Sequence, residues 1–368
     1  MPETLLQFGA GRFLRAFVDR FLQEAKDAGH DLGSAVVVQT TPGRRAELLG
    51  ESGYPVLIRG VIGDETIDRV QRVTSISRAL VAAEAWREVM EVAASPTLTT
   101  IVTNATEAGY QLSPADRAEA AQPTTMPGML TQALFARFSA GESPLIVLPC
   151  ELIERNADRL KDLVAEQARR WQLPEAFLGW VTRECHWLNN LVDCIVTLPS
   201  AADPNVAVDP AAVQAEPFAL WAIEQRGIVP PLAVHPAVKM VEDLAPYYLR
   251  KVRILNGLHT AMAARYLPRG LTTVREVMTD SEASRWVRDV LWEEIVPVVV
   301  ARAERVAEFA ETVLDRLRNP FVEHRLRDIA NHHAAKMEVR LAPTVREFET
   351  LYGRKPRRLA EVLQTAVS

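Results

Sequence analysis

Short apolar runs and longer stretches with helical periodicity alternate along the first half of the chain. The apolar runs cover residues 4–8, 35–38, 55–59, 98–103 and 145–148 and are typical of strands buried on both faces. Between several of them apolar residues recur every three or four positions, as in residues 12–22, 77–92 and 128–139. Strands that alternate with helices predict an α/β fold with a doubly wound, Rossmann-like and mostly parallel sheet.

The pattern changes in the second half of the chain. Residues 199–210 are rich in proline and aspartate and predict a loop. From about residue 241 onward the pattern is helical, and Pro297 is expected to break or bend a long helical stretch over residues 281–310. We therefore expect a dinucleotide-binding domain over residues 1–240 and a mostly α-helical domain, carrying substrate-binding and catalytic groups, over residues 241–368.

Composition narrows the class of protein. A chain of 368 residues has room for two domains, and its formal net charge of −5 without a basic run argues against a nucleic-acid partner. No apolar stretch is long enough to span a membrane, and the acidic start lacks the features of a signal peptide. Three cysteines without a CxxC pair fit reduced thiols. These features predict a cytoplasmic enzyme with no membrane partner.

Gly9 and Gly11 stand between the first predicted strand and the first predicted helix. Glycines at this point let the backbone approach a pyrophosphate, and the start of a helix favours an anion. Leu14 replaces the third glycine of the usual fingerprint. An ordinary strand-to-helix turn is the alternative, but a strand on either side of the helix favours dinucleotide binding.

The end of the second predicted strand is less informative about the cofactor. An acidic residue is expected there to bind the adenosine ribose, but the chain reads Gln39-Thr40-Thr41. Arg44 and Arg45 follow, and they are either exposed side chains or ligands of a 2′-phosphate. NAD is the expected cofactor, and the choice between NAD and NADP stays open at this position.

A polar trio in an apolar helical stretch carries the candidate chemistry. On a helix that turns about 100° per residue, His259 lies at about 80° and Asn256 at about 140° from Lys251. A lysine withdrawn from water in such surroundings holds its proton less tightly, which suits a general base. The alternative is that Lys251 and Arg253 are exposed and that Asn256-Gly257 forms a turn.

The chain resembles the polyol-specific long-chain dehydrogenase/reductase (mannitol dehydrogenase) family in several motifs. The strongest is Lys251-x4-Asn256-x2-His259 in its Arg-Ile-Leu-Asn-Gly-x-His-Thr context. Further similar segments are residues 7–19, 104–109, 148–156, 189–193, 266–276 and 319–324, so the resemblance runs through most of the chain. Within the family, the branch that acts on tagaturonate or altronate looks most similar.

The resemblance implies a metal-independent hydride transfer between a nicotinamide and the carbonyl or carbinol carbon of a sugar acid or polyol. It implies Lys251 as the acid/base, with Asn256 and His259 polarising the reacting oxygen. A further asparagine from the nucleotide-binding domain is expected there. Asn156 is the candidate, although Leu152 stands at another position where family members often carry asparagine.

The resemblance also implies which residues contact the other groups. The residues expected to bind the cofactor are Phe8, Gly9, Gly11, Arg12, Phe13, Thr40, Asn104, Thr106 and Glu107. The residues expected to face the substrate are Arg316, Asn319 and His324, although a helix junction is the alternative for this region. His332-His333 lacks matching carboxylates, so no metal site is expected.

The substrate and assembly are less defined. A tagaturonate- or altronate-like sugar acid is expected, with mannitol, mannitol phosphate or fructuronate as alternatives within the family. A nucleotide-binding protein without catalysis is a further alternative. A monomer or small homo-oligomer is expected.

Overall fold

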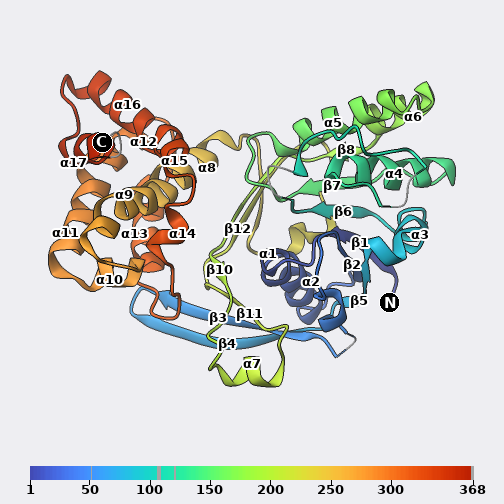
Figure 1. Ribbon diagram of the computed structural model, residues 1–368, viewed down its shortest axis with the longest axis horizontal. Coiled ribbons are helices and arrows are strands. Elements are labelled where there is room, and N and C mark those ends of the chain that lie inside the picture. Colours follow the sequence, from blue (N-terminus) through green and yellow to red (C-terminus); the bar gives the residue numbers. More distant parts are fainter. Residues whose placement is uncertain (51, 106–108, 120–121, 366–368) are drawn as a thin grey trace. The chain divides into compact units, whose positions relative to one another are not determined.

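The computed structural model describes residues 1–50, 52–105, 109–119 and 122–365, and the chain divides into two compact units (Figure 1). The first unit, here called the Rossmann unit, contains Met1–Ile58, Arg69–Ala215 and Ala219–Leu244. The second, here called the helical unit, contains Arg59–Asp68, Glu216–Phe218 and Ala245–Ser368. Two short segments that precede residue 240, Arg59–Asp68 and Glu216–Phe218, therefore belong to the helical unit.

A parallel six-stranded sheet forms the centre of the Rossmann unit, in the order β5-β2-β1-β6-β7-β8 (Figure 1). The strands are β1 (Glu3–Phe8), β2 (Ser34–Gln39), β5 (Ile76–Val81), β6 (Thr100–Thr103), β7 (Ile146–Pro149) and β8 (His186–Trp187). Strand β1 pairs in parallel with both β2 and β6, so the strand order reverses between β1 and β6. The predicted doubly wound parallel sheet is confirmed, and ligands bind such sheets at the point of reversal.

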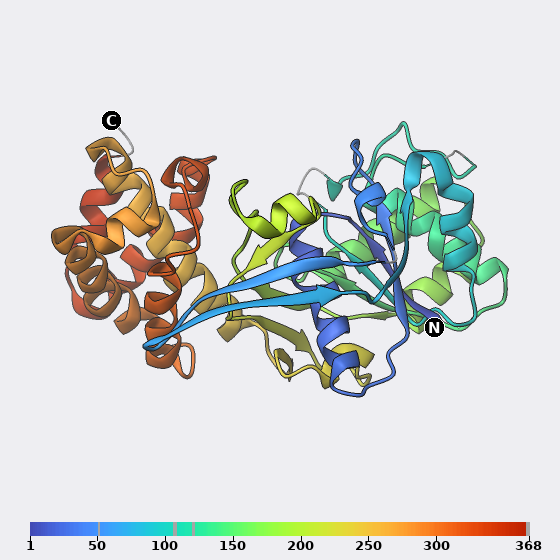
Figure 2. The ribbon, with the colours of Figure 1, turned by 90° about the horizontal axis from the view of Figure 1, so that it is seen from below.

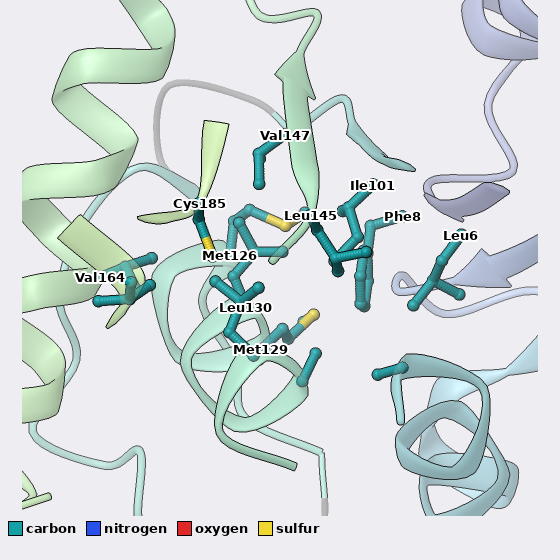
Figure 3. Packing of buried hydrophobic residues seen from close by; sticks show 14 of the residues in the cluster. Leu6, Phe8, Ile101, Met126, Met129, Leu130, Leu145, Val147, Val164 and Cys185 are labelled. Atoms are coloured by element: carbon teal, nitrogen blue, oxygen red, sulfur yellow. The ribbon is translucent and has the colours of Figure 1, made fainter. Parts of the chain in front are cut away.

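Alternate residues of the central strands enter two different cores. Leu6, Phe8 and Val147 pack on one face against helices α3 (Ala82–Ala93), α4 (Met126–Ser139) and α5 (Asn156–Arg170) (Figure 3). Leu5 and Leu148 pack on the other face against α1 (Arg12–Ala16), α2 (Val18–Asp27) and β12 (Leu220–Glu224). Because successive side chains of a strand point to opposite faces, a sheet covered on both sides needs continuous apolar runs.

Some predicted elements were wrong in extent. The predicted helix 77–92 starts as strand β5, which pairs with β2, and becomes helical only at α3. The predicted helix 12–22 is interrupted at Phe17, whose backbone is non-helical. The strand predicted at 55–59 exists but lies outside the main sheet, and the loop predicted at 199–210 contains the short helix α7 (Pro204–Val208). Pairing with a distant strand decides the structure at β5 and β3, and the side chain of Asp203 caps α7.

The remaining strands of the described residues form two smaller sheets. One has the order β10-β11-β3-β4 and contains β3 (Tyr54–Ile62), β4 (Glu65–Val73), β10 (Val196–Thr197) and β11 (Val213–Ala215). The other has the order β13-β12-β9 and contains β9 (Asn190–Asp193), β12 and β13 (Val238–Val241). Helix α6 (Glu175–Gly179) continues into a π-helical segment, Trp180–Glu184, before β8.

From residue 245 onward the chain is helical, as the sequence predicted (Figure 2). Its helices are α8 (Ala245–Arg250), α9 (Gly257–Tyr266), α10 (Val274–Thr279), α11 (Ser281–Asp289), α12 (Val296–Val299), α13 (Val306–Leu317), α14 (Leu326–Ile329), α15 (His333–Arg340), α16 (Ala342–Tyr352) and α17 (Arg357–Thr365). π-Helical segments join α8 to α9 and α11 to α12. Pro297 lies in the first turn of α12, and the helical stretch continues through it to Val299, so the break predicted at Pro297 occurs instead over residues 300–305, before α13. Within the described residues, no helix is long and apolar enough to cross a membrane.

Candidate active site

The turn after β1 has the backbone geometry of an anion-binding loop. Gly9 has a φ of +129°, and a Cβ there would lie 3.1 Å from Leu14 Cδ1 and 3.4 Å from the Asn104 carbonyl oxygen. Gly11 caps helix α1, and a Cβ there would meet no atom within 4 Å. Glycine is therefore required at position 9 by backbone conformation and packing, whereas position 11 leaves open space beside the N–H groups that begin the helix.

Leu14 explains why the third glycine of the fingerprint is absent. Its side chain is buried in the core that lines one face of the sheet, and its Cδ1 occupies space that a Cβ at position 9 would approach to 3.1 Å. Close contact between this helix and the sheet is thus made by a leucine rather than by a glycine. Arg12 beside it is exposed, and Phe13 is half-buried with its ring stacked on Phe17.

Asn104 lies next to the glycine turn at the end of β6. Its backbone N–H donates to the carbonyl of Phe8, and its side-chain amide donates to the carbonyl of Cys150. The ends of β1 and β6 are where the strand order reverses, which is the usual place for a dinucleotide. The ring of Phe8 is buried against Trp86, so Phe8 offers only its backbone here. Thr106 and Glu107 lie outside the described residues.

The end of β2 carries a glutamine that holds its own loop. The Gln39 amide nitrogen donates to the carbonyls of Thr41 and Gly43, and its side-chain oxygen accepts from the Ala46 N–H. Thr40 is half-buried beside it. The exposed guanidinium of Arg44 pairs with Glu47. The side-chain amide of Gln39 thus orders this loop. The dinucleotide-binding fingerprint has an acidic residue at this place, and Gln39 lacks its charge.

A buried polar network under the glycine turn was missed at the level of sequence. Gln7 donates through its side-chain amide to the Gly9 carbonyl, at 3.1 Å, and to Asp19 Oδ2, at 3.4 Å. Tyr54 donates its hydroxyl to the same carboxyl oxygen at 2.9 Å. Burial raises the pKa of Asp19 to about 7. The signal in the sequence was a glutamine inside an apolar strand and an aspartate on the apolar face of a helix.

Asn156 is fully engaged in holding the Rossmann unit together. Its amide nitrogen donates to carbonyls of Pro149, Glu151 and Asn190, and its side-chain oxygen accepts from the N–H groups of Ala157 and Asn190. The residue is 1% exposed. An amide has two hydrogens to donate, and here both have backbone acceptors.

In the helical unit, Lys251 begins a π-helical segment, Lys251–Asn256, that continues directly into α9. Single π-helical turns inside α-helices are rare and frequent at functional sites. Lys251 and Asn256 are half-buried, and Arg253 is buried and paired with Glu347. The alternative of an exposed Arg253 and a turn at Asn256-Gly257 was therefore wrong, and the regular 100° projection does not hold through this segment.

His259 lies inside the helical unit with one ring nitrogen unused. It is 5% exposed, its ring bonds to the backbone of Leu255, and Nε2 is buried without a hydrogen-bond partner in the described structure. Burial lowers its pKa well below the ordinary value, and His324 and Arg316 add to this effect. The rings of His259 and His324 are 4.7 Å apart. His259 is thus a neutral imidazole that can form one further hydrogen bond.

Arg316 and Asn319 have partners within the helical unit. The Arg316 guanidinium meets the Glu216 carboxylate at 2.8 to 3.1 Å and lies over the Phe218 ring, 4.2 Å from its centroid. Arg316 and Glu216 are both buried. Asn319 donates to the Arg59 carbonyl at 2.9 Å. These contacts attach the segments Glu216–Phe218 and Arg59–Asp68 to the helices.

A six-stranded parallel sheet has a glycine turn at its reversal point, and a helical unit follows it along the chain. This is the architecture of a two-domain, nucleotide-dependent dehydrogenase. Two family profiles match the chain: the mannitol dehydrogenase Rossmann domain over residues 3–232 and the mannitol dehydrogenase C-terminal domain over residues 243–367. The chain belongs to the mannitol dehydrogenase family. It is a dehydrogenase.

Relatives and solved structures agree with this assignment. The altronate oxidoreductase of Halalkalibacterium halodurans is 37% identical over 97% of this chain and 73% of its own length. That of Bacillus subtilis is 34% identical over 97% of this chain and 78% of its own length. The fold resembles mannitol 2-dehydrogenase from Pseudomonas fluorescens, solved with NAD and D-mannitol, with a TM-score of 0.82 at 22% identity over 99% of this chain and 78% of that one.

Proposed function

We propose that this protein transfers a hydride between NAD(H) and the carbinol or carbonyl carbon of an altronate-like sugar acid. The observation that carries the proposal is the arrangement in the helical unit, where Lys251, Asn256 and His259 fall within two successive helical segments, the first of them π-helical. The substrate class is supported by relatives named altronate oxidoreductase that are 33% to 37% identical to nearly the whole chain.

Each residue of the trio has a proposed task. Lys251 takes the proton of the reacting hydroxyl through Nζ during oxidation and returns it to the carbonyl oxygen during reduction. Asn256 donates from its side-chain amide to the same oxygen and stabilises the negative charge that develops there. His259, as a neutral imidazole, uses Nε2 for a hydrogen bond to the substrate. No step in this scheme uses a metal ion.

The cofactor fits the residues of the glycine turn. The open space at Gly11 and the N–H groups that begin α1 suit a pyrophosphate, and the Asn104 backbone adjoins the same turn. When bound, NAD(H) supplies the hydride acceptor or donor, which the protein's own side chains lack. The chain's residues bind it and orient it through Gly9, Gly11, Arg12, Phe13 and the residues at the ends of β2 and β6.

Other residues from the resemblance are proposed to position the site. Asn156 holds the ends of β7 and β9 together through its hydrogen bonds to Pro149 and Asn190. Because these bonds use its side-chain groups, we assign it a positioning role. Arg316 and Asn319 fix two segments to the helices, and His324 lies beside His259. Their proposed role is therefore to place and polarise the groups that contact the substrate.

Replacement of Lys251 tests the mechanism. Lys251→Ala is expected to lower kcat for altronate oxidation by about 100-fold or more, because general acid–base catalysis contributes a factor of this size. NADH binding, measured by fluorescence titration, is expected to stay within about twofold of wild type. Lys355→Ala, at an exposed lysine of the same unit, is the matched control.

Substrate and mechanism are read from the same assay. The wild type is screened with NAD and NADP against hexonates, hexuronates and hexitols by the absorbance of the reduced nicotinamide. Near-normal turnover of Lys251→Ala on the preferred substrate would contradict the role of Lys251. Preference for a neutral hexitol would replace the sugar acid as substrate and leave the acid/base assignment intact.

A further inference from the structure

One face of helix α15 carries three nitrogen-bearing side chains that the reaction scheme does not use. His333, Lys336 and Arg340 stand three and four residues apart, and such spacing places side chains on one side of a helix. All three are partly buried rather than fully in water. Solvated positively charged residues on a surface need no explanation, but partly buried ones do.

Arg340 is half-buried, and no carboxylate meets it in the described part of the chain. Its Nη1 donates to Thr260 Oγ1 at 3.3 Å, and no acidic side chain is within ion-pair distance in the part of the chain that the structure describes. Arg253 and Arg316, by contrast, pair with Glu347 and Glu216. The guanidinium of Arg340 thus keeps donors that the described protein groups do not take up.

The two neighbours of Arg340 have the same character. Lys336 Nζ donates to the carbonyl of Ile329 at 2.9 Å, and burial lowers the pKa of Lys336, with the positive charge of Arg340 adding to the effect. Both ring nitrogens of His333 are buried and have no hydrogen-bond partner within the described residues. Burial also lowers the pKa of His333. A bound anion would offset the repulsion between two positively charged groups that stand close together in partly buried positions.

This face is close to the catalytic trio within the same unit. Helix α15 packs against α9 and against the π-helical segment that begins with Lys251. Thr260, the residue that Arg340 contacts, directly follows His259, and the charge of Arg340 helps to lower the pKa of His259. An anion held by Arg340 would therefore lie beside the helix that carries His259.

We propose that Arg340, assisted by Lys336, binds the carboxylate of the substrate and so selects sugar acids over neutral polyols. The inference rests on the proposed function and names the group that recognises the acid. A guanidinium presents paired donors in the plane that a carboxylate accepts, and such charge-assisted bonds are among the strong ones in proteins. His333 contributes a neutral hydrogen-bonding group beside the two cations.

Substitution of Arg340 tests the proposal with a matched pair of substrates. Arg340→Gln is expected to lower kcat/KM for altronate by about 30- to 100-fold, the effect of removing a hydrogen bond to a charged group. For altritol, in which a hydroxymethyl group replaces the carboxylate, the change is expected to stay below about threefold. Arg340→Lys is expected to recover part of the loss, and Arg346→Gln, at an exposed arginine of α16, is the control.

Binding measured without turnover separates this proposal from the proposed function. Altronate is titrated calorimetrically into the NADH-loaded wild type and into Arg340→Gln. If the wild type turns over no sugar acid but binds altronate in an Arg340-dependent way, the reaction fails and the subsite stands. Lys336→Gln, expected to weaken altronate binding several-fold, replaces Arg340→Gln if that variant does not fold.

Three outcomes would overturn the proposal. Equal losses with altronate and altritol would make Arg340 a general structural residue. Unchanged altronate binding in both Arg340→Gln and Lys336→Gln would show that the carboxylate does not bind to this face of α15. A wild type that prefers a sugar phosphate to altronate would assign the cations to a phosphate instead.

Discussion

Single residues under the glycine turn show how chemistry is built into the core. Asp19 is fully buried, accepts from Tyr54 and Gln7, and keeps one carboxyl oxygen without a partner in the described structure. Burial raises its pKa to about 7, and the nearby charge of Arg15 opposes that shift only in part. Gln7 in turn supports the Gly9 carbonyl. The ionisation of one buried side chain is therefore linked to the loop that is proposed to bind the cofactor.

Asp19 is expected to make the free energy of unfolding fall with rising pH. Its pKa is about 7 in the folded chain and 3.8 for the ordinary group, so the folded chain holds the proton more tightly. The stabilisation that the folded chain gains from this tighter proton binding is complete below pH 4. It is lost as the pH rises toward 7 and above, where Asp19 loses its proton in the folded chain as well. Between pH 5 and pH 8 this linkage amounts to about 2 to 3 kcal/mol.

The variant Asp19→Asn isolates that effect. The free energy of unfolding is measured in urea at pH 5 and at pH 8 for the wild type and for Asp19→Asn. Its change between the two pH values should be larger in the wild type by the amount given above, since asparagine does not titrate. The exposed Asp162→Asn serves as the control. A difference between wild type and Asp19→Asn that does not change with pH would show that Asp19 ionises normally.

At the scale of elements, the two glycines of one turn have separable roles. Gly9 adopts a backbone conformation that side chains rarely take, and a Cβ there would press on Leu14 and on the Asn104 carbonyl. Gly11 has an extended backbone and open space around it. The fold therefore requires glycine at position 9. At position 11 the fold tolerates a side chain, and glycine is required only if a ligand occupies the space beside it.

A pair of alanine substitutions tests this distinction. Gly9→Ala is expected to destabilise the protein by about 1 to 3 kcal/mol, because the residue would be strained. Gly11→Ala is expected to leave the unfolding midpoint unchanged and to weaken NADH binding at least tenfold, since its methyl group would occupy space meant for phosphate. Thermal unfolding and fluorescence titration measure the two effects. Wild-type NADH affinity in Gly11→Ala would place the pyrophosphate elsewhere.

For the whole molecule, ligand binding and stability are linked. A ligand that binds only the folded chain raises the free energy of unfolding by about 2.7 kcal/mol at 100 times its Kd. The loop after β2 influences whether NADH or NADPH stabilises the protein more. Gln39 is occupied by its own loop, and the guanidinium of Arg44 is exposed and paired with Glu47.

NADH is therefore expected to stabilise the protein more than NADPH at equal concentration. Differential scanning fluorimetry should show a rise in the unfolding temperature with NADH, and less than half of that rise with NADPH. The rise with NADH should be smaller in Gly11→Ala. An equal rise with both nucleotides would mean that Arg45 or another cation accepts the 2′-phosphate.

The sequence predicted much of the fold, because the main strands are apolar runs and the helices have regular periodicity. It failed where a distant partner decides the structure, as at Ile76–Val81, which is a strand only because β2 pairs with it. It identified Lys251, Asn256 and His259 as candidates by motif. It did not reveal that Lys251–Asn256 is π-helical or that the Asn156 amide is already occupied.

The sequence by itself thus determined the order of elements, the position of the glycine turn and the family motifs, because these depend on residues close together in the chain. Only the tertiary structure decided that Arg316 pairs with Glu216 and that Arg340 lacks a carboxylate in the described chain. Charge pairing depends on which segments fold against one another, and the partners of Arg316 and Arg340 lie 100 and 80 residues away along the sequence.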